Sequence, residues 1–316
     1  MRFIRESQKL QIATLNQQAL ANPAALVQQA EDDFDAQLDR AVQWIAQEPQ
    51  RFIFLTGPSA SGKTTTTKML IQRLEELGRR ATYVSLDNFY KSREDIPLWE
   101  DGSKNFEALE ALDLAYLEQL AAQLTQTGHA QFPLFDFREG KRREKTFPVV
   151  MDGNSFVVFE GIHALNPYLT DKIQCVNCLR IYVSPHSIFT DNNNEQVLGT
   201  EDLRLVRRIV RDHTTRGFTA DRTIEMWHKV RRGELEYIRP YRSYADIHIN
   251  STHAYEPMLY VEELRACLDE CHTPEIQEVR ERLLTALGHF ERLDIGCVPG
   301  SSLLREFLPA LRSRPE

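Results

Sequence analysis

The sequence predicts an α/β fold, a mostly parallel β-sheet with helices on both of its faces. Apolar runs of strand length alternate with helix-period segments between Arg51 and Asn250, a pattern typical of parallel sheets whose strands are joined by helices. The first apolar run leads directly into a glycine-rich turn and then a helix. With 316 residues, of which 42% are hydrophobic and 27% charged, the chain can bury one large core. We therefore expect one enzyme-sized unit with an appendage.

The predicted elements follow in a simple order. Residues 1–48 are rich in Gln and Ala, show helical spacing and contain a break at Asn22-Pro23, which predicts a helical N-terminal arm. Residues 132–154 combine short apolar pieces, a basic cluster and an Asp-Gly turn signal, so they predict an inserted β-hairpin. The other expected elements are strands over 51–56, 81–86, 155–161, 179–184 and 245–250 and helices over 63–77, 107–124 and 201–215.

Charge and hydropathy exclude two classes of partner. The chain carries a formal charge of −8, which lacks the basic balance of a general nucleic-acid-binding protein. Its first residues contain no apolar leader segment, and no run of roughly eighteen apolar residues occurs in it. We therefore expect no nucleic acid as partner, no membrane span and a cytoplasmic location. Any anionic ligand must be held by a local patch.

The five cysteines leave two interpretations open. An odd number in a long chain without an export signal does not favour a disulfide framework. Cys175 with Cys178, and Cys267 with Cys271, have spacings from which a four-thiolate zinc site could form. One pair, however, runs into the strand expected at 179–184 and the other fits one helix face. Small buried hydrophobic residues are therefore the better interpretation.

The stretch TGPSASGKTTTTK contains the pattern Gly57-x-x-x-x-Gly62-Lys63-Thr64 between an expected strand and an expected helix. Glycines let backbone N–H groups turn inward and the helix N-terminus adds positive potential, so such a loop captures phosphate groups. Lys63 can reach the terminal phosphates, and the Thr64 hydroxyl can ligate Mg²⁺. This P-loop predicts a P-loop NTPase fold with a nucleoside triphosphate as ligand. The residues expected to bind it are Gly57, Ser59, Ala60, Ser61, Gly62, Lys63, Thr64 and Thr65.

Two carboxylates stand at the ends of expected strands. A P-loop needs an acidic group near its metal ion, and Glu160 ends the run VVFE. There it could coordinate Mg²⁺ directly or hold one of the groups that coordinate it. Asp87 follows the strand expected at 81–86, where an acceptor hydroxyl could meet the γ-phosphate. It therefore suits a base that positions and deprotonates the acceptor, with a contact to the metal as a further role. The alternative for Asp87 is an ordinary turn-capping residue.

A basic segment lies within this acidic chain. Between Leu203 and Arg242 there are eleven Lys and Arg against five Asp and Glu. A solvated charged face is the usual explanation of such a run, and we favour it for members such as Arg222. Others fall at adjacent helical positions and could converge on the phosphates during transfer. These are Arg204, Arg207, Arg208 and Arg211.

Seven motifs follow one another between about residues 50 and 250: GPSASGKTT, SLDNFY, NFEALEALDL, FDFREGKR, VVFEGI, DLRLVRRIVRDHTTRG and RPYRSYADIHIN. In these motifs the chain resembles the uridine kinase and phosphoribulokinase-like family of P-loop kinases. A bacterial uridine kinase-like branch also shares EGIHALNP, MWHKVRRGELEYI and VPGSSLLREF, which extends the resemblance nearly to the C-terminus. It implies a kinase domain over 49–316, with a lid at about 201–242 and a helical extension at about 258–316.

The resemblance implies phosphoryl transfer from ATP, with Mg²⁺, to the 5′-hydroxyl of a pyrimidine nucleoside. Asp87 would be the base, Lys63, Thr64 and Glu160 the phosphate and metal groups, and Arg204, Arg207 and Arg211 the lid arginines. The small-molecule substrate would meet Asp87, Tyr90, Glu107, Phe135, Phe137 and Arg142. Well-known pyrimidine nucleoside kinases have Asp in place of Glu107, a base-reading histidine in place of Gly140 and a tyrosine in place of Phe135. The ribose site is thus retained, whereas the base-reading part differs.

Two other functions stay open at this stage. Lys141, Arg142 and Arg143 would also tolerate an acidic or phosphorylated acceptor such as a sugar phosphate, as in a phosphoribulokinase-like enzyme. In a non-catalytic switch module, ATP binding would instead order the arginine-rich segment for a partner. Asp87 argues against that function, because a switch need not activate an acceptor hydroxyl. The sequence is also compatible with a homo-oligomer.

Overall fold

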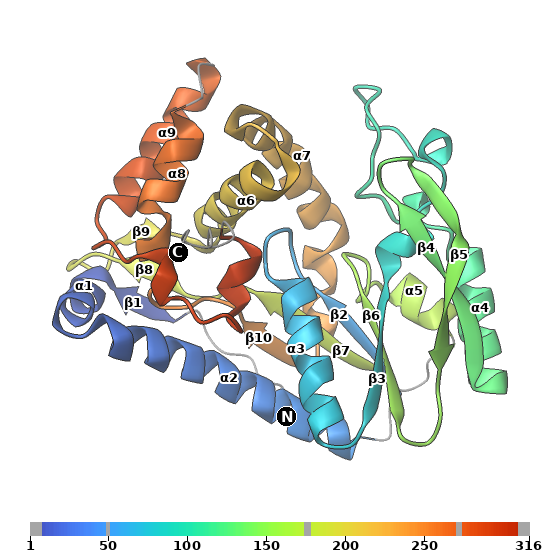
Figure 1. Ribbon diagram of the computed structural model, residues 1–316. Coiled ribbons are helices and arrows are strands. Elements are labelled where there is room, and N and C mark those ends of the chain that lie inside the picture. The colour runs from blue at the N-terminus through green and yellow to red at the C-terminus, as the bar shows by residue number, and fades with distance from the viewer. Residues whose placement is uncertain (1–7, 49–50, 174–177, 270–273, 309–316) are drawn as a thin grey trace, which may run out of the picture.

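The computed structural model describes residues 8–48, 51–173, 178–269 and 274–308 (Figure 1). Its centre is a five-stranded parallel sheet in the order β10-β7-β2-β6-β3. The central strands β2 and β6 are buried along their whole length, as expected for a sheet that is covered on both faces. The α/β P-loop architecture predicted from the sequence is confirmed. The strands span Phe52–Thr56 (β2), Arg80–Ser85 (β3), Ser155–Glu160 (β6), Leu179–Ser184 (β7) and Ile247–Asn250 (β10).

Two apolar cores lie on the two faces of the sheet. Successive side chains of a strand point to opposite faces, so Ile53 and Leu55 of β2 join one core while Phe52 and Phe54 join the other. The first core packs against α2 (Pro23–Gln47), α3 (Lys63–Glu76) and α6 (Thr200–Arg216). The second packs against α4 (Leu114–Thr127) and α5 (Pro167–Lys172). Figure 1 shows these helices on either side of the strands.

The N-terminal helices belong to the first core. Helix α1 (Ile12–Ala21) ends at the expected break, where the side chain of Asn22 accepts a hydrogen bond from the backbone of Ala25 and caps α2. The apolar positions of α2, among them Phe34 and Leu38, are buried against the sheet side of the molecule. The short strand β1 (Lys9–Gln11) pairs with β8 (Ile188–Thr190), which pairs with β9 (Gln196–Leu198). This small sheet was not predicted, because three-residue strands carry almost no periodicity.

The inserted hairpin is confirmed, with its turn in a different place. Strands β4 (His129–Asp136) and β5 (Lys141–Val150) pair antiparallel, and the turn between them contains Gly140 in the left-handed region at φ 68°. The Asp-Gly signal at 152–153 instead marks the connection from β5 to β6. The helix expected over 107–124 begins only at Leu114, because Asp113 accepts a hydrogen bond from the backbone of Tyr116 and caps it there.

The arginine-rich segment forms two helices, α6 and α7 (Ala220–Tyr237), and the chain continues through α8 (Tyr260–Leu268), α9 (Pro274–Leu287) and a short turn at Leu303–Glu306. Cys178 and Cys267 are buried in different apolar cores, so these two do not share a site; Cys175 and Cys271 lie outside the described residues. Within the described ranges, no helix has the length and hydropathy needed to cross a bilayer.

Candidate active site

The P-loop lies between β2 and α3 and depends on both of its glycines. A Cβ at Gly57 would lie 2.0 Å from the carbonyl oxygen of Val183, so the close approach of loop and β7 requires glycine. Gly62 has φ 86° at the start of α3, a conformation that strongly favours glycine. The Leu303 side chain packs against it from the C-terminal segment. The loop therefore presents its backbone to a cavity, as anion capture requires.

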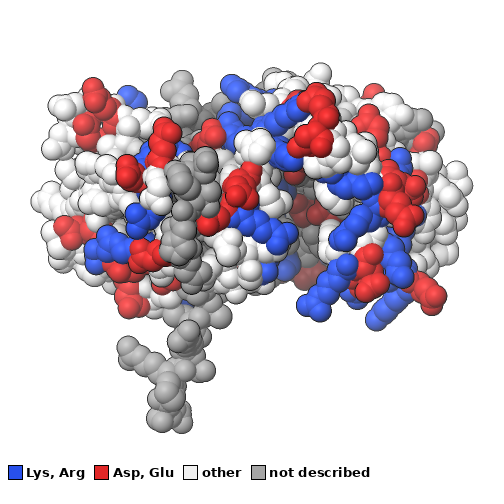
Figure 2. All heavy atoms as spheres, turned by 90° about the horizontal axis from the view of Figure 1, so that it is seen from above, with Lys and Arg blue, Asp and Glu red and all other residues white. Residues whose placement is uncertain are grey.

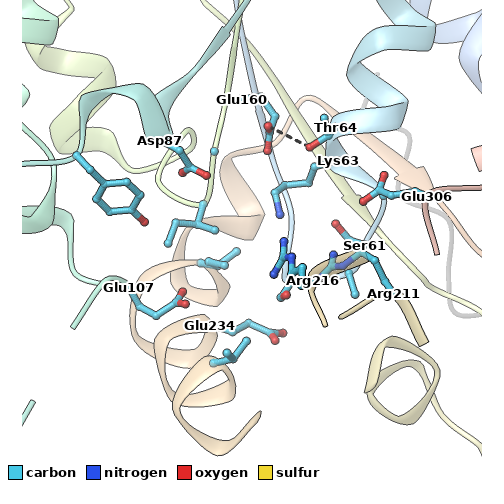
Figure 3. A pocket seen from close by; sticks show the side chains of 18 residues that line it. Ser61, Lys63, Thr64, Asp87, Glu107, Glu160, Arg211, Arg216, Glu234 and Glu306 are labelled. Atoms are coloured by element: carbon cyan, nitrogen blue, oxygen red, sulfur yellow. Dashed lines mark hydrogen bonds between the residues drawn. The ribbon is translucent and has the colours of Figure 1, made fainter. Parts of the chain in front are cut away.

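The P-loop borders a polar cavity of about 280 Å³ (Figure 3). It opens beyond the carboxyl ends of the parallel strands, the usual position of ligand sites in open α/β sheets. Seen from above, Lys and Arg side chains flank a hollow with acidic residues deeper inside it (Figure 2). The polar side chains that line the cavity are Ser59, Ser61, Lys63, Thr64, Asp87, Tyr90, Glu107, Glu160, Arg211, Arg216, Glu234 and Glu306.

Thr64 and Glu160 lie together at one wall of this cavity. The Thr64 hydroxyl donates a hydrogen bond of 3.4 Å to Glu160, and the Tyr83 hydroxyl donates one of 2.9 Å to the same carboxylate oxygen. A hydroxyl beside a carboxylate suits Mg²⁺, which binds oxygen atoms and commonly takes only one or two carboxylates together with phosphates. The described part of the chain contains no cluster of three His, Cys, Asp or Glu residues that could hold a metal ion.

Asp87 faces the P-loop side chains across the cavity, as Figure 3 shows. Burial, followed by the negative charge of Glu160, raises the pKa of the Asp87 carboxyl to about 6, while Lys63 and Arg216 act in the opposite direction. A carboxylate with this pKa is mostly ionised at neutral pH and is a stronger base than an ordinary aspartate. Burial likewise raises the pKa of Glu107 to about 7. The cavity thus holds two carboxyl groups whose ionised forms are disfavoured by burial. A bound cation, or a hydroxyl that donates a hydrogen bond, would stabilise these ionised forms.

A second cavity of about 560 Å³ adjoins the first, and Asp87, Tyr90 and Arg216 line both. Its walls are largely aromatic: the ring centroid of Tyr90 lies 5.9 Å from that of Phe135, and that of Phe135 lies 5.2 Å from that of Phe137. The structure therefore brings these three predicted substrate residues together. The remaining lining residues are Arg93, Phe106 and Gly140.

Arg142 does not lie in either cavity. Its guanidinium donates a hydrogen bond of 2.7 Å to Asp113 and lies over the ring of Tyr116, with 4.9 Å to the centroid. This differs from its expected role at the substrate. The physical reason is the ion pair with Asp113, the N-cap residue of α4, which holds this residue of β5 at the start of that helix.

Of the three predicted lid arginines, only Arg211 lines the phosphate cavity. Arg204 is buried and donates to the backbone carbonyl of Ser59 and to Glu234. Arg207 is fully buried, bridges Ala60 to Ser251 and pairs with Glu256. The structure thus places Arg204 and Arg207 behind the P-loop, where they hold its carbonyl groups, rather than in the cavity. Helix α6 packs its apolar residues into the core, which turns these two positions inward.

Four charged cavity residues were missed by the sequence analysis: Arg93, Arg216, Glu234 and Glu306. Arg216 stands at the end of the predicted basic helix and its side chain is half exposed, so the charge pattern could have included it. Glu306 lies in the motif VPGSSLLREF, more than two hundred residues after the P-loop. No local pattern indicates that this residue returns to the phosphate site.

The chain matches known proteins over its central part. Residues 52–256 match the model of the phosphoribulokinase / uridine kinase family. A uridine kinase of Borrelia duttonii is 29% identical over 212 residues, which cover 67% of this chain and 91% of the relative. One from Clostridium botulinum is 28% identical over 196 residues, 62% of this chain and 85% of the relative. The solved phosphoribulokinase of Rhodobacter spheroides is 21% identical with a TM-score of 0.42, over 63% of this chain and 69% of that one. The chain belongs to the phosphoribulokinase / uridine kinase family.

Proposed function

We propose that this protein transfers the γ-phosphoryl group of ATP, with Mg²⁺, to a hydroxyl of a small metabolite, most readily the 5′-hydroxyl of uridine or a related nucleoside. One observation carries the proposal: Asp87 stands where a phosphate-binding cavity and an aromatic cavity meet. A hydroxyl held in the second cavity would meet a phosphoryl group held in the first at this carboxylate. Family membership supports the kinase chemistry, and the uridine kinases among the relatives support the acceptor.

Each cavity residue has a role in such a transfer. The inward-facing backbone of the P-loop and Lys63 would hold the phosphates. Thr64 and Glu160 would hold Mg²⁺, which when bound neutralises charge on the phosphates. Asp87 would accept the proton of the attacking hydroxyl, since its carboxylate is ionised at neutral pH yet unusually basic. Arg211 and Arg216 face the same cavity and would stabilise the charge that shifts during transfer.

The aromatic cavity fits a flat heterocycle better than a bare sugar. Rings of Tyr90, Phe135 and Phe137 offer faces and edges on which a base can stack. Glu107 lies nearer the phosphate cavity, where it could accept hydrogen bonds from ribose hydroxyls. Gly140 adds no side chain to the wall, so selection among bases would rest on stacking more than on hydrogen bonds.

A phosphorylated or acidic acceptor is the second candidate, and two arginines favour it. Arg93 and Arg216 line the aromatic cavity, and no ion pair links Arg93 to a carboxylate within the described ranges. The basic residues of the hairpin contribute less than expected, because Arg142 and Arg143 pair with Asp113 and Asp136. A non-catalytic switch would not need a carboxylate such as Asp87 between the two cavities.

The test is ADP release with a panel of acceptors, followed by identification of the phosphorylated product. Uridine, cytidine, adenosine, ribulose 5-phosphate and a reaction without acceptor form the panel. We expect release to depend on a pyrimidine nucleoside and to yield its 5′-monophosphate, with Asp87→Asn as the inactive control. Release driven by the sugar phosphate alone would support the second candidate. ADP release that no acceptor changes would overturn both in favour of the switch.

A further inference from the structure

A third cavity, of about 200 Å³, lies behind the P-loop, and Glu234 is its one lining residue in common with the phosphate cavity. It is open to solvent on one side and is bordered by Pro58 of the P-loop, the end of β7 with the turn that follows, the start of α6, the end of α7 and the segment 239–242. The proposed reaction uses none of its other residues. The complete lining is Pro58, Tyr182, Ser184, Pro185, His186, Thr200, Glu201, Arg204, Arg231, Glu234, Arg239 and Arg242.

The charge of this cavity is unbalanced. Four arginines face two glutamates. Arg231 pairs with both glutamates, at 2.7 Å to Glu201 and 2.6 Å to Glu234, and Arg204 shares Glu234 at 2.8 Å. Among the described residues, no ion pair joins either of the other two arginines, Arg239 and Arg242, to a carboxylate. Arg239 and Arg242 are both exposed residues, and their two positive charges are not balanced by a carboxylate of that part of the chain.

His186 is a further polar residue of the same wall. Its Nδ1 lies 3.2 Å from the Arg242 guanidinium, which can only donate, so Nδ1 must accept and the ring proton must sit on Nε2. Burial, followed by the positive charge of Arg242, lowers the pKa of His186 to about 4, so the ring is neutral at physiological pH. Its Nε2 is buried and has no hydrogen-bond partner within the described ranges. The Nε2–H of the neutral His186 ring therefore has no acceptor among the described residues.

We propose that this cavity is a second anion site, which binds a phosphate or phosphomonoester group of a small metabolite. Guanidinium groups form paired hydrogen bonds with such oxyanions. A phosphate carries a charge of roughly −1.5 to −2 at neutral pH, which matches these two arginines better than a single carboxylate would. The volume of about 200 Å³ accommodates this group.

Binding at this site would change the catalytic cavity through Arg204 and Glu234. Arg204 lies between Glu234 and the Ser59 carbonyl of the P-loop, and Glu234 faces both cavities. An anion that attracts Arg204 and Arg231 would weaken their pairing with Glu234 and leave its charge facing the triphosphate site. The anion should therefore lower the affinity for ATP, and ATP should lower the affinity for the anion by the same factor. This coupling rests on the proposed function, whereas anion binding itself does not.

The direct test is calorimetric titration of the full chain with inorganic phosphate. Because the P-loop also binds phosphate, every protein in the series carries Lys63→Ala. The series comprises that protein alone, the same protein with Arg239→Gln and Arg242→Gln, and a matched control with Arg138→Gln and Arg222→Gln, which removes two exposed charges elsewhere. We expect one phosphate per chain, an affinity at least about tenfold weaker in the Arg239→Gln/Arg242→Gln variant, and no change in the control.

Competing anions identify the chemistry of the site. Sulfate should displace phosphate, while acetate at the same concentration should not. Equal displacement by acetate would overturn the phosphate assignment. No phosphate bound at up to about 10 mM, a very weak affinity, or an equal loss in the control would overturn the site itself. With Lys63 intact, phosphate should raise the Kd for ADP further in the unmutated chain than in Arg239→Gln/Arg242→Gln, because only direct competition at the P-loop remains in that variant; an equal rise in both would overturn the coupling. A failed acceptor screen would not affect these binding results.

Discussion

The hydroxyl of Thr65 donates a hydrogen bond of 2.6 Å to the carboxylate of Glu306, and the Thr65 backbone N–H lies 3.4 Å from the same oxygen. Thr65 stands in the first turn of α3, where donors of a P-loop meet phosphate oxygens. A side chain from 241 residues further along the chain thus holds donors that a nucleotide would use.

Glu306→Gln should therefore bind ADP and ATP more tightly, on the order of five- to tenfold, because it removes a negative charge from a site built for anions. Isothermal titration with ADP gives the Kd. Glu291→Gln is the matched control, since Glu291 is an exposed acidic residue of the same C-terminal segment, and it should leave the Kd unchanged. Weaker binding in Glu306→Gln would mean that the carboxylate supports the nucleotide instead.

Lys63→Ala should reduce kcat by a factor of about 10² or more, because the lysine contacts the phosphates where charge shifts. Within the described residues its side chain makes one hydrogen bond, of 3.2 Å to the Pro58 carbonyl, so the fold should persist. Far-ultraviolet circular dichroism and the Tm check the fold, and coupled ADP release measures kcat. Undiminished turnover in the folded variant would remove the P-loop from the mechanism.

Asp87→Asn should lose activity by about 10²-fold while it gains stability. The folded-state pKa of about 6 lies above the ordinary 3.8, so the folded protein binds this proton more tightly than the unfolded chain does. The carboxylate therefore destabilises the fold as pH rises from about 4 to 6, and the full cost of about 1–3 kcal/mol persists above that range. Urea denaturation should show the Asp87→Asn variant as more stable than the unmutated protein at pH 8 and nearly equal to it at pH 4. A variant less stable at pH 8 would contradict the assigned burial cost.

The same ionisation sets a pH dependence for catalysis. Because the proposed base must be unprotonated, kcat/KM should fall as pH drops through about 6. A pH profile of the unmutated enzyme between about pH 5 and 9, on the scale where such groups titrate, measures this directly. In Asp87→Asn the residual rate should lack this acidic limb. If kcat/KM of the Asp87→Asn variant still falls as the pH drops through about 6, the titrating group is not Asp87.

Arg207→Met should cost stability more than catalysis. The guanidinium is fully buried against Glu256, and removing it leaves an unpaired buried charge at a cost of about 3–5 kcal/mol. Urea denaturation measures the loss. Arg207→Met/Glu256→Gln should recover part of it, and Arg222→Met, which changes an exposed part of α7, should change little. A stable Arg207→Met protein with low kcat would restore the lid role predicted from the sequence.

A mobile lid over 201–242 stays a prediction, and the structure suggests which part of it can move. Residues 203–210 are already buried, so hydrogen exchange there should be slow with or without ligand. Added protection with a non-hydrolysable ATP analogue and an accepted nucleoside should concentrate near Arg216 and along α7, whose Lys229 and Arg232 reach across to Asp101 and Glu100. Equal exchange in both states along this whole stretch would show that no lid closes.

Local sequence patterns predicted those parts of the structure that are determined by neighbouring residues. The P-loop, its strand and its helix follow from glycine spacing and hydrophobic period, and they appear where expected. The late start of α4 was missed because helix period over 107–124 outweighed the capping signal of Asp113. Arg207 was predicted to contact the phosphates because the sequence shows the charge of a side chain but not the side of the helix on which it packs. Its partner Glu256 lies 49 positions away, and only tertiary packing reveals that pairing.

The contact between Gly62 and Leu303 has a consequence for how the protein is made. Chains are synthesised from the N-terminus, and segments that fold early can be native long before later ones exist. Here the phosphate loop is translated about 240 residues ahead of the leucine that supports it. Long-range closure of this kind slows folding. The nascent protein should therefore acquire its nucleotide affinity in a late step, after residue 303 has left the ribosome, and until then the loop is exposed to chaperones and proteases.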